Sequence, residues 1–308
     1  MSKLNPSKLS PMSDCQLIFC VLLCIQFGAF VDSARGTFSR SDDDKFQMLI
    51  AGGIVPEHGV FVRNLVSIRT LNYISFYGDN HFCTGVITSS RTILTAAHCV
   101  TDNHRSIMHP RGLMVIFGAL KRLERYTEDE SRRVHKIVVH PHYKRYKIND
   151  VAILQLTTVI PANLRHVKPV IKRKHLEVTI GMECVTMGWG QVYPHGPYAD
   201  EVMFLDVIIR PPQHCKNQDY FEKEGNICTE PVNEGQVCPG DLGGPLMCQS
   251  YMAGIIGASK GCQGINSIKF INFSYVEDWV EKTVVDLSAN RCKISLLFYI
   301  PFVTHIIF

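Results

Sequence analysis

Short apolar runs separated by glycine, proline and asparagine dominate the chain from residue 50 onward. Runs of this length, bounded by turn residues, are typical of the strands of an all-β sandwich or barrel. Strands are expected on this basis at Leu65–Ile68, Gly85–Thr88, Met114–Phe117, Lys136–Val139, Val151–Leu156, Cys184–Met187, Phe204–Ile209 and Ala253–Ile256.

One segment near the carboxyl end has a different period. Val276, Trp279, Val280 and Val284 recur at helical spacing. Ser274 precedes them, and Glu277 follows it in the spacing of a capping box. A helix beginning near Ser274 is therefore predicted.

Two apolar runs lie outside the strand-rich region. The first spans residues 17–30 behind Lys3 and Lys8, with small residues at 31–34. This pattern predicts a signal peptide over 1–33 and a polar pro-segment over 34–49, with an uncleaved signal anchor as the alternative. The second run, 294–308, is interrupted by Pro301 and is short for a membrane span. Residues 291–308 are therefore expected to form an apolar tail without membrane attachment.

The composition indicates a folded, exported protein. The 308 residues are 46% hydrophobic with a net charge of +4, which excludes a disordered chain and does not imply nucleic acid as a partner. Twelve cysteines are scattered without a CxxC pair, so disulfides in an oxidising compartment are expected, and a metal site or other cofactor is not. The protein is accordingly predicted to be secreted and extracellular.

Three motifs carry candidate chemistry. They are Thr95-Ala-Ala-His98-Cys99, then Asn149-Asp150-Val-Ala-Ile-Leu, then Gly240-Asp-Leu-Gly-Gly-Pro245. A histidine, an aspartate and a glycine-rich loop in this order resemble the chymotrypsin-like serine protease family over residues 50–290. The resemblance implies two six-stranded antiparallel β-barrels with a cleft between them and a C-terminal helix. It makes His98 the base, Asp150 its orienting carboxylate, and the backbone of Gly240 and Leu242 the oxyanion hole.

The same resemblance implies a set of disulfides. The expected pairs are Cys83–Cys99, Cys184–Cys248, Cys215–Cys228 and Cys238–Cys262. Cys292 is left over, beside the apolar tail.

The glycine-rich loop departs from the family at its reactive position. The family has GDSGGP there, whereas this chain has Leu242 in place of the nucleophilic serine. An isobutyl group has no atom that can attack a carbonyl, so no acyl-enzyme can form. The chain is therefore expected to be a non-catalytic homologue that binds active proteases, substrates or inhibitors of a secreted pathway. A serine-type endopeptidase of low or masked activity is the first alternative.

Other cleft positions also depart from active relatives. Gly257-Ala258-Ser259 stands where the family has Ser-Trp-Gly, which removes a hydroxyl beside Asp150 and an aromatic platform. Ser259 and Ser267 are expected to narrow the specificity pocket. Gln236 matches the pocket floor, where a neutral amide offers no charge to Arg or Lys.

The start of the protease-like region resembles the family's mature amino terminus. Ile50-Ala-Gly-Gly53 is similar to IVGG, and in the family the new isoleucine ammonium pairs with the residue that is Asp241 here. Leu49 stands where trypsin-activated members have Arg or Lys. The acidic run that ends at Lys45 resembles an enteropeptidase site displaced by four residues. Whether the chain is cut before Ile50 is left open.

Basic residues form loose clusters that suggest a second alternative, a glycan-binding secreted protein. They are Lys121, Arg122, Arg125, Arg132, Arg133 and Lys136, then Lys144, Arg145 and Lys147, then Arg165, Lys168, Lys172, Arg173 and Lys174. Solvated loop charge and a site for sulfated glycans both fit this pattern. No nucleic-acid module accompanies it. Asn272-Phe-Ser274 is a candidate glycosylation site at the start of the predicted helix.

Overall fold

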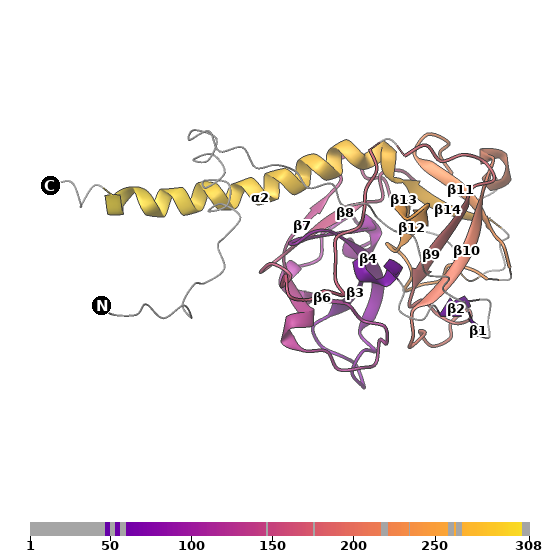
Figure 1. The fold of residues 1–308 in the computed structure, drawn as a ribbon, viewed down its shortest axis with the longest axis horizontal. Coiled ribbons are helices and arrows are strands. Elements are labelled where there is room, and N and C mark those ends of the chain that lie inside the picture. Colours follow the sequence, from indigo (N-terminus) through magenta and orange to yellow (C-terminus); the bar gives the residue numbers. More distant parts are fainter. Residues whose placement is uncertain are drawn as a thin grey trace, which may run out of the picture. The chain divides into compact units, whose positions relative to one another are not determined.

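Two closed antiparallel barrels make up the protease-like region. The computed structural model describes residues 47–49, 53–55, 60–145, 147–174, 176–216, 221–233, 235–257, 262 and 267–303. The burial of side chains is described within residues 62–289. The first barrel is closed in the order β3-β4-β5-β8-β7-β6 (Figure 1). Its strands are β3 (Leu65–Thr70), β4 (His81–Ser89), β5 (Thr92–Thr95), β6 (Leu113–Phe117), β7 (Ser131–Val139) and β8 (Ala152–Leu156).

The second barrel repeats this design later in the chain. It is closed in the order β10-β11-β14-β13-β12-β9, again with antiparallel pairs. Its strands are β9 (Glu183–Gly188), β10 (Met203–Arg210), β11 (Asn226–Pro231), β12 (Pro245–Cys248), β13 (Tyr251–Ile256) and β14 (Ile268–Asn272). The expected fold, two six-stranded antiparallel barrels and a C-terminal helix, is confirmed.

All eight strands expected from apolar runs are present, and four more complete the barrels. The four extra strands are β5, β11, β12 and β14, which are short or interrupted by polar residues. They pair on both sides within a closed barrel, so neighbouring strands satisfy their backbone groups. A single buried apolar cluster then joins the two barrels to the helix; its members include Val86, Leu94, Met187, Trp189, Val276 and Val280.

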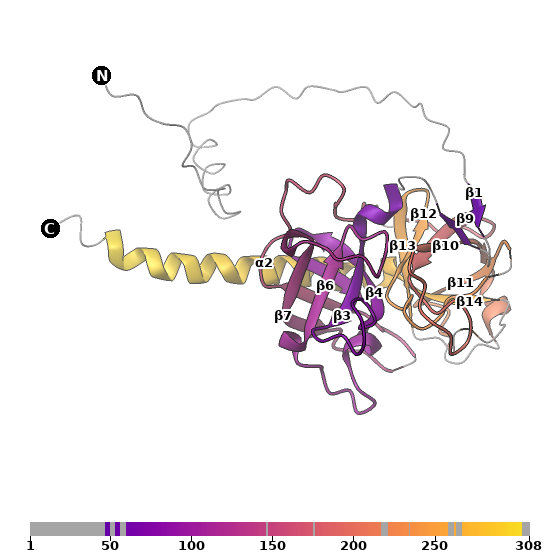
Figure 2. The same ribbon diagram turned by 90° about the horizontal axis from the view of Figure 1, so that it is seen from below.

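Short 3-10 helices and a small hairpin complete the described elements. The 3-10 helices are η1 (Val60–Asn64), η2 (Ala97–Val100), η3 (Pro110–Gly112), η4 (Glu128–Glu130) and η5 (Pro212–Cys215). The hairpin pairs β1 (Gln47–Leu49) with β2 (Gly53–Val55), on either side of Ile50. Figures 1 and 2 both place β2 beside β10. Ile50 itself lies outside the described residues.

Four disulfides tie the barrels internally. The pairs are Cys83–Cys99, Cys184–Cys248, Cys215–Cys228 and Cys238–Cys262. These are the pairs that the family resemblance implies. Cys99 lies in η2 next to His98, so the first of them fixes the segment that carries the histidine to strand β4.

The predicted helix is α2 (Phe273–Val303), and it begins earlier than expected. The carboxamide oxygen of Asn272 accepts a hydrogen bond from the backbone N–H of Ser274 at 3.1 Å, as an N-cap side chain does. The hydroxyl of Ser274 instead points to the carbonyl of Leu176 at 3.5 Å. The expected capping box at Ser274 is therefore wrong, because Asn272 at the end of β14 already caps the helix. None of the described helices combines the length and apolar character that a membrane span requires.

Helix α2 also packs against the first barrel. The side-chain amide of Gln155 in β8 donates to the carbonyl of Leu287 at 3.1 Å. The rings of His140 and Trp279 lie 4.7 Å apart, which buries one face of the histidine and lowers its pKa to about 4. These contacts fix the last strands of both barrels relative to each other, and with them the cleft between the barrels.

The cap at Asn272 gives a stability prediction. Changing Asn272→Ala leaves an unsatisfied N–H at the start of α2 and is expected to lower the free energy of unfolding by about 1 kcal/mol. Asn272→Asp keeps an acceptor and is expected to retain most of the stability. Urea unfolding of protein made without glycosylation measures both. An equal decrease in the free energy of unfolding in the two variants would show that loss of the helix cap is not the cause.

Candidate active site

His98 and Asp150 are brought together by the pairing of two first-barrel strands. His98 follows β5 in η2, and Asp150 immediately precedes β8, which pairs with β5 through Thr95 and Ala152. The Nδ1 atom of His98 lies 2.7 Å from Oδ2 of Asp150, and the backbone N–H of His98 donates to Oδ1 at 2.8 Å. Asp150 is 2% exposed. Two bonds from one buried carboxylate fix both the position and the tautomer of the imidazole, which is the arrangement of a general base.

The glycine-rich turn places Leu242 beside this pair. The backbone carbonyl of Leu242 accepts from the N–H of Thr84 at 2.9 Å. The sulfur of Cys99 lies 3.7 Å from that carbonyl oxygen and 3.9 Å from Nε2 of His98. Gly243 has φ +85°, and a side chain there would collide with Thr84 and Thr95, so the turn needs glycine at this point. The backbone of the reactive turn is thus in place, and its central side chain is aliphatic.

The side chain of Leu242 lies between the two barrels. It is partly buried and packs against the apolar clusters of both the first and the second barrel. A serine side chain would offer little apolar surface at the same position. The substitution therefore removes a nucleophile and adds a hydrophobic contact across the cleft.

The neighbouring carboxyl group, Asp241, is partly buried. Its oxygens accept from the backbone N–H of Gly190 at 2.6 Å and of Cys238 at 2.9 Å. Side chains at Gly188 or Gly190 would collide with the carboxyl group, so the glycines let the backbone approach it. Burial outweighs the two hydrogen bonds and raises the pKa of Asp241 to about 6.

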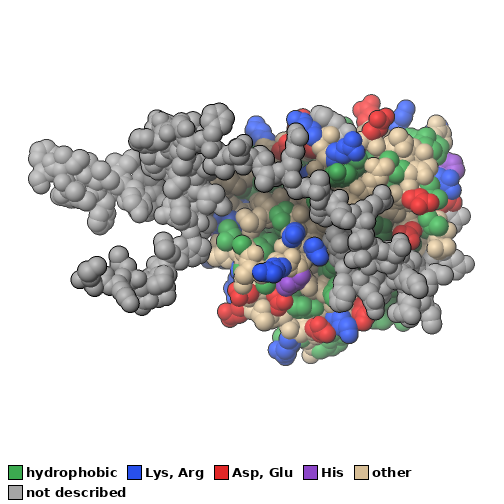
Figure 3. Space-filling view, in the orientation of Figure 1, with side chains coloured by type: hydrophobic (Ala, Val, Ile, Leu, Met, Phe, Trp, Pro, Cys, Tyr) green, Lys and Arg blue, Asp and Glu red, His purple; other side chains and the backbone are tan. Residues whose placement is uncertain are grey.

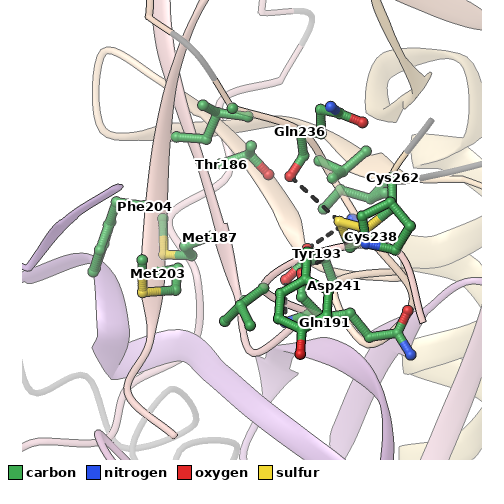
Figure 4. Close-up of a pocket in the computed structure, with 18 residues that line it drawn as sticks. Thr186, Met187, Gln191, Tyr193, Met203, Phe204, Gln236, Cys238, Asp241 and Cys262 are labelled. Atoms are coloured by element: carbon green, nitrogen blue, oxygen red, sulfur yellow. Dashed lines mark hydrogen bonds between the residues drawn. A yellow bond between two sulfur atoms is a disulfide. The ribbon is translucent and has the colours of Figure 1, made fainter. Parts of the chain in front are cut away.

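A pocket of about 460 Å³ opens next to Asp241 (Figure 4). Its wall combines polar and apolar groups, and the apolar lining residues include Met187, Val192, Tyr193, Pro194, Met203 and Phe204. Gln236 and Asp241 both line it. Of the other residues expected in a specificity pocket, Ser267 is not among the lining residues and its hydroxyl donates to the carbonyl of His214 at 3.4 Å. Ser259 and Ala258 lie outside the described residues, so the assignments of Ser259 to the pocket and of Ala258 to the platform position stay predictions.

The turn is also held by a buried histidine that the sequence motifs did not reveal. Nε2 of His81 donates to the carbonyl of Gly240 at 3.2 Å, and the hydroxyl of Thr84 donates to the same oxygen at 2.7 Å. Nδ1 of His81 therefore accepts from the hydroxyl of Ser67, at 2.9 Å. Burial, with help from nearby Arg69, lowers the pKa of His81 to about 3, which keeps the ring neutral.

Arg122 is a second residue whose role differs from expectation. The sequence places it in a basic cluster that fits solvated loop charge or a glycan site, but its side chain is buried, with 4% exposure. Its guanidinium donates to the carbonyls of Gly78, Tyr198 and Ala199 at 2.7, 3.1 and 2.9 Å. It thereby joins a first-barrel loop to the loop carrying Tyr198, and a side chain at Gly240 would collide with the Tyr198 ring. A buried arginine thus supports the outer side of the reactive turn.

Two cysteines and a histidine near the reactive turn form a cluster of potential metal ligands. Cys83, His98 and Cys99 have ligand atoms within 4.8 Å of one another. Both sulfurs belong to the Cys83–Cys99 disulfide, so they offer no thiolate to a metal ion. This cluster is a disulfide next to a base.

The position of Leu242 predicts a stability effect. Leu242→Ala removes apolar contacts with both barrels, and is expected to lower the free energy of unfolding by about 1–3 kcal/mol. Leu120→Ala, at a side chain that is half exposed, serves as the matched control and is expected to change it by less than about 1 kcal/mol. Chemical unfolding measures both. A Leu242→Ala variant with an unchanged free energy of unfolding would contradict the proposed contact across the cleft.

The raised pKa of Asp241 predicts a pH effect. Because the folded-state pKa is about 6 and the ordinary value is 3.8, the contribution of Asp241 to stability is fully present below about pH 4 and is lost as the pH rises through 6. The loss amounts to about 3 kcal/mol. Unfolding of the uncut chain between pH 4 and 8 should show this decline, and Asp241→Asn should reduce it. Asp286→Asn, at an exposed position on α2, should keep the wild-type profile, and matching profiles for all three proteins would refute the assignment.

Comparison with known proteins places this geometry in a family. The family model described as Trypsin matches residues 66–280. Serine protease SP24D of Anopheles gambiae is 29% identical over 76% of this chain and 81% of the relative, and granzyme B of Rattus norvegicus is 28% identical over 76% and 92%. Among solved structures, human heparin binding protein is 25% identical with a TM-score of 0.58, covering 72% of this chain and 91% of that one. Mouse neuropsin is 23% identical with a TM-score of 0.59, and the match covers 72% of this chain and 95% of neuropsin. At this identity the likeness supports the fold alone. With two closed barrels, four disulfides and a buried His98–Asp150 pair beside the reactive turn, this chain belongs to the trypsin family of serine proteases.

Proposed function

We propose that this chain is a secreted, non-catalytic member of the trypsin family that acts by binding other proteins of a protease pathway, namely active proteases, their substrates or their inhibitors. The observation that carries the proposal is Leu242 at the position of the nucleophile. Acyl transfer in this family needs a hydroxyl that His98 can deprotonate. An aliphatic side chain supplies neither the proton nor the attacking oxygen, and loss of the nucleophile costs about 10⁶ in rate in comparable enzymes.

The surroundings of Asp150 support the same proposal. A Cβ atom at Gly257 would lie 3.9 Å from Oδ2 of Asp150, so a hydroxyl side chain at this position would come near the carboxylate, and glycine has none. The same Cβ would lie 2.9 Å from Cδ1 of Ile271, so a larger residue there needs a shift of that side chain. Together with Ala258 and Ser259, this difference suggests a cleft that is no longer shaped for turnover.

A switch by cleavage before Ile50 is part of the proposal. Asp241 is partly buried, and it lines a pocket large enough for an amino-terminal residue. An ammonium group next to the carboxyl would favour its charged form and lower its pKa. Release of Ile50 would then tighten the turn at Gly240 and change the surface offered to a partner, without producing activity.

Export is supported by the four disulfides, which persist in oxidising compartments. The leader over residues 1–33 would direct it. The carboxamide of Asn272 accepts from Ser274 as a helix cap, so glycosylation at this sequon would have to compete with the cap.

Two alternatives retain specific support. The intact His98–Asp150 geometry favours an endopeptidase of low activity. The likeness to a structure titled human heparin binding protein, at 25% identity, favours a glycan-binding protein.

The test of the catalytic question uses protein with Ile50 as its amino terminus. Deleting residues 46–49 places the acidic run and Lys45 directly before Ile50, so that enteropeptidase can release it. We expect this protein to hydrolyse no member of a broad peptide library above the rate of a His98→Ala control. Leu242→Ser in the same background is expected to remain far below an active relative, because Gly257 and Ala258 are unchanged. If the protein with its natural Leu242 hydrolyses a peptide, and His98→Ala abolishes this turnover, the non-catalytic proposal is overturned.

A further inference from the structure

The connector between the barrels, residues 157–182, carries an unusual charge pattern. Its central part, residues 161–176, is called the basic connector here. It contains Arg165, Lys168, Lys172, Arg173 and Lys174, and residues 157–176 contain no aspartate, glutamate, phenylalanine, tyrosine or tryptophan. The first basic cluster differs, because Glu124, Glu128, Asp129 and Glu130 lie among its cations and Arg122 is buried.

The basic connector is fixed to both barrels through its backbone. The N–H of Lys168 donates to the carbonyl of Arg63 at 2.9 Å, and that of Val170 to Ile87 at 2.8 Å. On the second barrel, the N–H of Met252 donates to the carbonyl of Ile171 at 3.2 Å. Pro161 and Pro169 further restrict the chain. The cations are therefore held on a pre-ordered segment, which lowers the entropic cost of binding a ligand.

Apolar and charged side chains divide between the core and the solvent. Val167, Val170 and Leu176 are buried, at 8, 5 and 6% exposure. Charged residues of the same stretch are exposed; these are Arg165, Lys168, Arg173 and Lys174. Lys172 forms an ion pair with Glu281 of α2 at 3.5 Å, and the guanidinium of Arg173 lies 5.8 Å from the ring centre of Tyr251. In Figure 3, Lys and Arg side chains occur over the first barrel and near α2.

These observations favour a long anion over a small one. Arg165 and Lys174 are nine residues apart, and backbone hydrogen bonds at Lys168, Val170 and Ile171 attach the stretch between them to both barrels. A row of cations along such a segment fits a polymer with regularly spaced anionic groups. Nucleic acid is disfavoured, because residues 157–176 contain no phenylalanine, tyrosine or tryptophan on which bases could stack.

We propose that the basic connector is a binding site for a linear sulfated glycan. The site lies between the barrels on the outside of the molecule, and uses Arg165, Lys168, Arg173 and Lys174 as direct contacts. It does not depend on the chemistry at Leu242, so it stands whether or not the protein has catalytic activity.

The test compares two variants of the full chain that lose the same charge. The first, Arg165→Gln/Lys168→Gln/Lys174→Gln, changes the basic connector. The control, Arg111→Gln/Lys136→Gln/Lys223→Gln, changes exposed cations on other elements. Calorimetry with a size-defined heparin oligosaccharide at about 0.15 M salt and at higher salt measures affinity and its salt dependence. N-desulfated heparin and double-stranded DNA are the comparison ligands.

The wild type is expected to bind heparin at about 0.15 M salt and to bind desulfated heparin and DNA more weakly. The connector variant should lose roughly tenfold or more in affinity, and the slope of log affinity against log salt should fall by about one for each lost contact. The control should stay within about twofold of the wild type. Bound heparin should also protect Lys168 and Lys174 of the wild type from acetylation, a readout that needs no variant.

Three results would overturn the proposal. The first is no heparin binding by the wild type at that salt concentration. The second is an equal loss of heparin affinity in both variants, which would show that heparin is attracted by net charge alone. The third is DNA binding as tight as heparin binding and equally sensitive to the connector variant, which would indicate a general polyanion site.

Discussion

The reactive turn, residues 239–243, is held where the two barrels meet, and the site depends on how it is held. The carboxyl of Asp241 reaches the backbone of Gly190 and Cys238 on one side. The carbonyls of Gly240 and Leu242 receive donors from the first barrel on the other. Leu242 then adds apolar contacts with both barrels. The turn thus holds an aliphatic side chain in contact with both barrels at the position where the family has serine.

Sequence reasoning predicted the motif residues and most strands, because both have local signals. His98, Asp150 and the turn at Leu242 stand in recognisable motifs, and the apolar runs marked eight of twelve barrel strands. The supports of the turn could not be predicted in this way. Arg122 contacts three carbonyls up to 77 positions away in sequence, and its burial depends on loops that the barrels bring together. Asn272 was missed as a cap because Ser274 and Glu277 offered a stronger local pattern.

The proposed non-catalytic role separates two properties that are linked in an active protease. The His98–Asp150 pair, the disulfide beside it and the hydrogen-bonded Asp241 are features of positioning. Reactivity needs one additional atom, the nucleophilic oxygen, and this chain lacks it. A scaffold that keeps positioning without reactivity retains a shaped cleft and rigid loops, which are the features a binding protein requires. The basic connector lies on this scaffold outside the cleft, so partner binding at the two places can be studied separately.

The central claim is that position 242 cannot form a covalent bond with an acylating or phosphonylating reagent. The most direct measurement is the intact mass of the protein, cut before Ile50, after incubation with a fluorophosphonate. No mass increase is expected on the wild type, whereas Leu242→Ser provides the comparison in which a hydroxyl is present. A stoichiometric adduct on the wild-type protein, located by peptide mapping to the turn at residue 242, would contradict the account.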